Sequence, residues 1–167
     1  MGRYVGIPLL LVAALLNATL MAELRLGGGA PDLVFLVVIS WALLGDAREA
    51  MWWAVIGGVA QDLLSMAPLG ASSLGLVIVA FAADALFGDV PRSNLIVPPL
   101  VAAAGTVIYH VVLIGVLRLE SLVMPLGQGM AYVTLPTLIF HALLAIPAFR
   151  LMGMVHYWLT PRRVRLD

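Results

Sequence analysis

Cysteine and lysine are both absent from the 167-residue sequence. Without cysteine the chain forms no disulfide, no thiolate metal site and no cysteine nucleophile, and its redox compartment cannot be read. Charge of either sign is scarce as well, because charged residues make up 11% of the chain and nine acidic residues balance nine basic ones. A chain without a basic or acidic excess gives no reason to expect a nucleic-acid partner or a strongly charged substrate.

Apolar residues, by contrast, make up 63% of the chain. A water-soluble domain of this size could not bury that much apolar surface, so a lipid bilayer must cover the remainder. The first apolar run follows Arg3 and could be taken for a signal peptide. A signal core is about 7 to 15 residues long and precedes a small-x-small site. This run is longer and offers Leu20-Met21-Ala22, so we interpret it as a membrane helix.

Apolar runs separated by charge, glycine or proline predict an all-α integral membrane protein with six transmembrane helices in one membrane domain, residues 1–167. The expected spans cover approximately residues 4–24, 31–44, 50–66, 70–87, 96–117 and 132–157. The second span is short, because 14 residues rise only about 21 Å against a hydrocarbon core of about 30 Å. Either the glycines at 27–29 dip into the membrane or the bilayer is thinner there. Pro136 and Pro147 predict an interrupted, kinked sixth span.

The distribution of arginine predicts the orientation, since Lys and Arg are retained on the cytoplasmic side of short loops. Two arginines, Arg25 and Arg118, fall on one side of the six spans. The seven on the other side are Arg3, Arg48, Arg92, Arg150, Arg162, Arg163 and Arg165. Tryptophan and tyrosine gather near the same interface, as interfacial anchors do. We therefore expect a multi-pass protein with both termini in the cytoplasm.

Polar side chains within the expected spans are functional candidates, because each is costly in lipid unless it is paired. They are Asn17, Asp32, Gln61, Asp62, Asp84, His110 and His141. Asp32 follows Pro31 at the start of a span, where a carboxylate caps free helix amides. The two histidines lack the H-E-x-x-H spacing of a zinc pair, so bonds between helices are favoured over metal binding or proton relay, although their roles stay open. No metal or cofactor is expected.

Two rows of small residues indicate close helix packing. Ala54, Gly58 and Asp62 share one helix face, and the corner Pro68-Leu69-Gly70 follows. Asp62 either meets water and loop amides or fixes the fold by hydrogen bonds. The second row is Ala14, Ala18 and Ala22 in the first span, and whether it meets a helix of this chain or of a partner is open.

An enzyme-like pattern is present too. Gly70-Ala71-Ser72-Ser73 opens the fourth span and His141 lies in the sixth, an arrangement similar to the serine and histidine dyad of rhomboid intramembrane proteases. The last glycine of the rhomboid G-x-S-G pattern is Ser73 here, and the small-residue spacing expected after the histidine is missing. An intramembrane serine protease is therefore a remote alternative.

The order of these features over essentially the full length resembles the rod shape-determining protein MreD family. The resemblance rests on the six-span layout, on Pro31-Asp32, and above all on Gly57-Gly58-x-x-Gln61-Asp62-Leu63-Leu64-Ser65 followed by Pro68-Leu69-Gly70. It implies a non-enzymatic scaffold subunit of the bacterial cell-elongation complex, in the cytoplasmic membrane. The implied partners are the bitopic protein MreC and, indirectly, the actin-like MreB and the glycosyltransferase and transpeptidase that build lateral peptidoglycan.

The MreD family is also similar in architecture to the substrate-binding S-components of energy-coupling-factor transporters. An S-component-like subunit for vitamin uptake is therefore the second alternative. It would dock a coupling subunit through Ala14, Ala18 and Ala22 and hold a small molecule in its outer half. The sequence leaves open which helices meet partners, whether the chain forms a homodimer, and whether a cavity holds lipid or another ligand.

Overall fold

The computed structural model describes residues 2–21, 23–25, 27–45, 47–65, 67–88, 94–119 and 130–159. Ala22, Arg92 and the three arginines after residue 160 lie outside these described residues. Within the described ranges the chain is helical, and the only extended pairing recorded there is an isolated bridge between Gly27 and Gly29.

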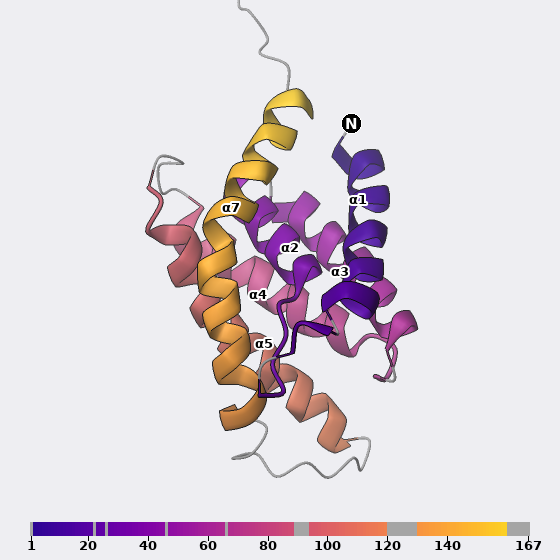
Figure 1. Cartoon of the computed structure of the whole chain (residues 1–167). Coiled ribbons are helices and arrows are strands. Elements are labelled where there is room, and N and C mark those ends of the chain that lie inside the picture. The colour runs from indigo at the N-terminus through magenta and orange to yellow at the C-terminus, as the bar shows by residue number, and fades with distance from the viewer. Residues whose placement is uncertain are drawn as a thin grey trace, which may run out of the picture.

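The described residues form six α-helices, which confirms the predicted all-α fold class (Figure 1). They are α1 (Gly2–Leu16), α2 (Leu33–Leu44), α3 (Ala47–Leu64), α4 (Ala71–Phe87), α5 (Val97–Leu119) and α7 (Leu135–Leu159). A π-helical segment, η1 (Asn17–Met21), continues α1, and another, η2 (Met130–Thr134), precedes α7. By length and composition, α5 and Tyr132–Leu159 are long and apolar enough to cross a membrane, and three shorter apolar helices accompany them. Of the two interruptions expected in the last span, the one at Pro147 is not observed, since α7 continues through it, whereas the π-helical η2 gives way to α7 next to Pro136.

Helix α2 is the centre of the bundle. It contacts α1, α3, α4, α5 and α7, and ten of its twelve residues are buried. A helix that is apolar on all sides is stable where other elements surround it. Because protein surrounds α2, its rise of about 18 Å does not have to match the thickness of the bilayer.

The glycine segment before α2 explains how so short a helix is placed. Gly29 is buried, and a Cβ atom added to it would lie 2.7 Å from the backbone nitrogen of Thr137 and the carbonyl oxygen of Val133. This segment therefore packs directly on the start of α7. Non-helical backbone is tolerated at membrane depth where protein covers it. The arrangement favours the first of the two explanations for the short second span, in which the glycines dip inward.

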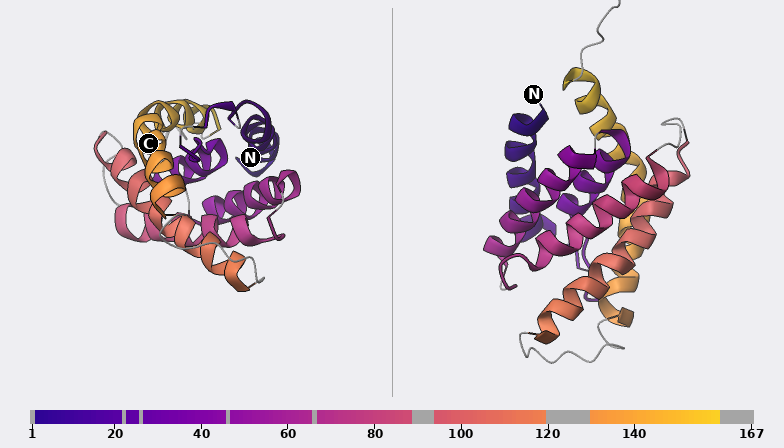
Figure 2. Two further views of the ribbon diagram at one scale, coloured as in Figure 1. Left: turned by 60° about the horizontal axis from the view of Figure 1, so that its bottom comes forward. Right: turned by 180° about the vertical axis from the view of Figure 1, so that it is seen from behind.

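The remaining helices surround α2 in sequence order. α1 packs on α3, α3 on α4, α4 on α5 and α5 on α7, while α2 lies between α1 and α7 (Figures 1 and 2). The described chain starts and ends at the same end of the bundle, here called the terminal end. The opposite end, called the far end, contains the segment that joins η1 to α2, the last turn of α5 and the start of α7.

Candidate functional site

Asp32 is the centre of a hydrogen-bonding network in the far half of the bundle. Its Oδ1 accepts from the backbone N–H of Phe35 at 3.0 Å, which caps α2 as the sequence predicts. The same oxygen accepts from Asn17 Nδ2 at 2.7 Å, and Oδ2 accepts from Gln61 Nε2 at 2.7 Å. Three donors from three elements thus converge on one carboxylate, which is how a charge inside a membrane protein is compensated.

Asn17 ties the end of α1 to the start of α2. While its amide nitrogen donates to Asp32, its Oδ1 accepts from the backbone N–H of Leu33 at 2.8 Å. It occupies the first position of η1, where the helix widens from α to π. Two opposed hydrogen bonds from one amide fix both the approach and the rotation of the two segments.

His141 of α7 joins the same network and is fully buried. Its Nε2 accepts from the backbone N–H of Asp32 at 2.9 Å, so the proton of the neutral ring is assigned to Nδ1. Nδ1 then donates to Thr106 Oγ1 at 2.8 Å, and that hydroxyl donates to the carbonyl of Ala102 at 2.6 Å. The ring also stacks on Phe35, with centroids 4.4 Å apart. One histidine therefore links α2, α5 and α7.

The hydrogen bonds of His141 decide whether it can act as the base of the rhomboid-like serine and histidine dyad. Ser72 is buried at the start of α4, but both ring nitrogens of His141 already have partners, Asp32 and Thr106. No nitrogen remains to accept the Ser72 proton, which a serine nucleophile requires of its base. His110, the other intramembrane histidine, pairs through Nδ1 with Thr134 Oγ1 at 3.0 Å. Both histidines make the interhelical bonds that the sequence favours.

Asp62 caps a helix other than its own. From the last turn of α3 its carboxylate accepts from the backbone N–H of Gly70 at 2.7 Å and of Ser72 at 3.2 Å. Gly70, the N-cap of α4, has φ of 94° and provides no side-chain cap. Only a glycine takes up that backbone conformation readily. Asp62 is 2% exposed, so its carboxylate contacts the amides of the α3–α4 corner, as both interpretations allowed, and is shielded from water.

Gly58 marks the closest approach of α3 and α4. A Cβ atom at this position would lie 2.4 Å from the backbone nitrogen and Cα of Ser73. Next to this contact Ser73 Oγ donates to the carbonyl of Val55 at 3.1 Å. Small residues that let two backbones touch, with a hydroxyl bonding across, are a typical way for helices to associate in lipid.

The remaining predicted residues have less direct roles. Pro31 is buried beside Asp32, and the carbonyl of Pro68 accepts from Ala71 N–H at 3.1 Å within the α3–α4 corner. In the alanine row, Ala14 is buried and lines a cavity together with Ala18, while Ala22 lies outside the described residues. Ala18 falls in η1, where the wider helix changes the spacing that placed the three alanines on one face.

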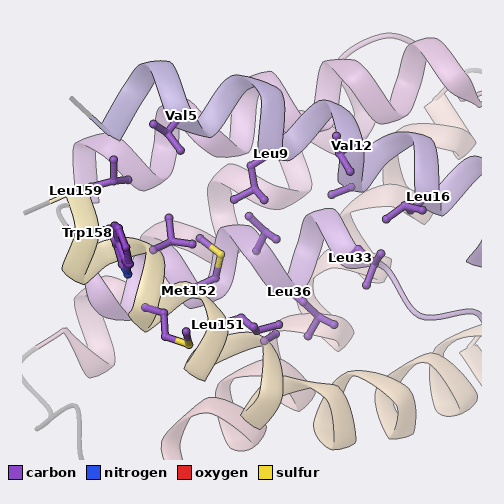
Figure 3. A pocket seen from close by; sticks show the side chains of 15 residues that line it. Val5, Leu9, Val12, Leu16, Leu33, Leu36, Leu151, Met152, Trp158 and Leu159 are labelled. Atoms are coloured by element: carbon purple, nitrogen blue, oxygen red, sulfur yellow. The ribbon is translucent and has the colours of Figure 1, made fainter.

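An apolar groove, which sequence reasoning did not find, lies on the other side of α1. α1 and α7 form its walls and α2 its floor, and its volume is about 630 Å³ (Figure 3). Among the described residues its lining is apolar apart from the indole nitrogen of Trp158. It runs from Val5 to Leu16 along α1 and from Ala148 to Leu159 along α7. Hydropathy could not reveal it, because a lipid-facing and a helix-facing leucine are equally apolar.

The network could have been anticipated in part. Asn17 and Gln61 lie toward the ends of the first and third predicted spans, and Asp32 lies at the start of the second. All three therefore fall on the same side of the membrane, and the sequence predicts their similar depth. What the sequence did not show is that they point inward to a common centre and that His141, 109 residues from Asp32, completes it. Within the described residues no group of three His, Asp or Glu side chains is placed to hold a metal ion.

Comparison with known proteins identifies a family for this chain. The family model of the rod shape-determining protein MreD matches residues 1–155 of the 167. The matched part contains every residue of the network and most of the groove. No curated protein and no solved structure matches the chain.

Proposed function

Because this chain belongs to the MreD family of rod shape-determining membrane proteins, we propose that it is a non-enzymatic scaffold that holds one membrane helix of an MreC-like bitopic protein in the groove between α1 and α7. Through that partner it acts in the cell-elongation complex, next to MreB and to the glycosyltransferase and transpeptidase of lateral peptidoglycan synthesis. The groove is the observation that carries this proposal.

The groove has the length and chemistry of a helix site. Val5 to Leu16 spans eleven residue steps, or about 17 Å of helix at 1.5 Å per residue. Its walls are two separate helices, α1 and α7, and both pack against α2. A partner helix would add two new helix contacts at once, and Met152 and Met154 offer flexible side chains that adapt to its surface.

The polar residues support a scaffold over an enzyme. Asp32, Asp62 and His141 each use their polar atoms to hold helices together, which leaves them poorly suited to hold a substrate. Ser72→Ala should accordingly leave rod shape intact in a complementation assay. Complete loss of shape with unchanged expression and stability would overturn the non-enzymatic interpretation.

We also propose a multi-pass arrangement in the bacterial cytoplasmic membrane with the terminal end in the cytoplasm. The two described chain ends share one end of the bundle, and the arginine distribution assigns the cytoplasmic side to the ends of the chain. A green fluorescent protein fused after Asp167 should be fluorescent, and alkaline phosphatase fused there should be inactive. Active phosphatase would overturn this topology.

The absence of cysteine makes the groove proposal directly testable. Val12→Cys points a single thiol into the groove, and Leu143→Cys places one on an exposed part of α7 outside it. In cells carrying single cysteines along the membrane helix of the MreC-like partner, Val12→Cys should give disulfide cross-links with helical periodicity. Leu143→Cys should give none, and equal cross-linking at both sites would refute docking in the groove.

A vitamin-uptake subunit stays a second candidate, favoured by a polar cavity at the far end of the bundle. Purification from the native host separates the two functions. Recovery of an MreC-like protein supports the scaffold, whereas recovery of ATPase coupling subunits would support uptake and contradict the scaffold.

A further inference from the structure

That second cavity, here called the polar pocket, lies on the opposite side of α1 from the groove. Its volume is about 440 Å³, within the range of small-molecule sites. α1, η1, α3, α4 and α5 contribute to it, whereas the groove is built from α1, α2 and α7. The wall also contains alanine and leucine side chains, and its polar lining residues are Asn17, Arg25, Gln61, Ser65, Ser72 and Tyr109.

Gln61 lines this pocket, and its side chain carries an unpaired acceptor. Its Nε2 donates to Asp32 Oδ2 at 2.7 Å, which fixes the orientation of the amide, because the reversed amide would set an oxygen against a carboxylate. Oε1 is consequently buried, and no described residue forms a hydrogen bond with it. A buried carbonyl oxygen in that position is stabilised by a ligand that brings an N–H or O–H group.

Arg25 supplies the opposite chemistry at the same pocket. It is an exposed cation, and within the described part of the chain no carboxylate forms an ion pair with it. A guanidinium matches the geometry of phosphate oxygens and forms strong charge-assisted hydrogen bonds with them. The pocket thus combines one cation, one acceptor in need of a donor, and hydroxyl groups from Ser72 and Tyr109.

We propose that the polar pocket binds a phosphate-bearing headgroup that also carries hydroxyl or ammonium donors, as phosphatidylglycerol and phosphatidylethanolamine do. The phosphate pairs with Arg25 and the donor meets Gln61 Oε1. Leu64 and Leu113 on the wall suit the first carbons of the attached glycerol and acyl chains. This site is separate from the groove, since the two cavities share none of the described lining residues.

Lipid retention measured on the purified full-length protein tests the site. The delipidated protein in detergent is titrated with phosphatidylglycerol, phosphatidylethanolamine or phosphatidylcholine of identical acyl chains, and bound lipid is counted by native mass spectrometry. Phosphatidylcholine keeps the phosphate but lacks a headgroup donor, so it should bind more weakly than the other two. Glycerol 3-phosphate is added as a water-soluble competitor. If it displaces bound phosphatidylglycerol, the natural ligand is a free phosphate ester, and if it does not, the natural ligand is a lipid. The site is supported in both cases.

Arg25→Gln should weaken phosphatidylglycerol binding about fivefold, the effect of about one interfacial charge. Arg118→Gln, in the last turn of α5, is the matched control, and this variant should bind phosphatidylglycerol as the wild type does. Thermal unfolding of both variants checks that neither loses its fold. Equal binding of all three lipids, or wild-type affinity in Arg25→Gln, would overturn the proposal whether or not an MreC-like partner copurifies.

Discussion

The hydrogen-bonded network and the apolar groove occupy neighbouring parts of one bundle and differ in what holds the helices in place. In the network, single side chains join segments as distant in sequence as Asp32 and His141. Around the groove, α1 and α7 are each anchored on α2 and face one another across apolar side chains.

This difference matters because lipid tails are as apolar as leucine, so helices in a bilayer gain little by simply burying apolar surface against each other. Close backbone contact and interhelical hydrogen bonds therefore set the positions of the helices. An apolar face without such bonds exchanges lipid for a partner helix at little cost. Through Asn17 and His141 the network holds the two wall helices, α1 and α7, against the start of α2, and the groove between them stays available. Mutations in the network and in the groove should therefore separate stability from partner binding.

The largest loss of stability is expected from Gly58→Leu. The α3 and α4 backbones meet at this residue, and even a Cβ atom would overlap the Ser73 backbone, so a leucine must force the two helices apart. The yield of monodisperse protein in size-exclusion chromatography should fall sharply. Gly153→Leu in α7 is the control, because a Cβ atom there meets nothing within 4 Å. Equal yields of the two variants would mean that the α3–α4 contact does not determine folding.

The next largest effect is expected from Asp32→Ala. This change leaves the donors of Asn17, Gln61 and the Phe35 amide without their acceptor. At about 1 kcal/mol or more for each stranded donor, the loss should reach about 3 kcal/mol. Unfolding by denaturing detergent measures it. Asp32→Asn keeps one acceptor oxygen and should lose clearly less, and an identical loss in both would assign the effect to charge alone.

Much of the fold follows from the sequence. The apolar runs indicated six helices, and Pro31-Asp32 indicated the N-cap of α2, because each depends on local composition and short-range bonding. The packing of Gly58 was also readable, since its row of small residues lies on one helix face.

What the sequence did not reveal depends on how the helices rotate about their axes. Rotation decides that Asn17, Gln61 and His141 point to one centre, and it is fixed by the completed bundle rather than by any local signal. The π-helical segment Asn17–Met21 likewise depends on the completed bundle. It orients Asn17 toward both Asp32 and Leu33, and it alters the spacing of the alanine row.

A smaller loss is expected from Asp62→Asn. The amide oxygen can still accept from Gly70 or Ser72, but its NH₂ group cannot accept the second bond, and the charge that favours the N-terminus of α4 is removed. The free energy of unfolding in denaturing detergent should fall by about 1 kcal/mol. A loss as large as that of Asp32→Ala would show that the α3–α4 corner belongs to the same cooperative unit as the network.

The smallest effect on stability, with a large effect on assembly, is expected from Val12→Trp. Val12 is 54% exposed on the groove wall, so an indole there displaces lipid and should change the free energy of unfolding by less than about 0.5 kcal/mol. The same indole occupies the space of a docked helix. Copurification of the MreC-like partner should fall and cells that depend on the variant should become round, while Leu143→Trp, on a 70% exposed site outside the groove, should preserve both. Rod-shaped cells with normal partner recovery in Val12→Trp would show that the partner binds another face, because a helix cannot share the groove with that side chain.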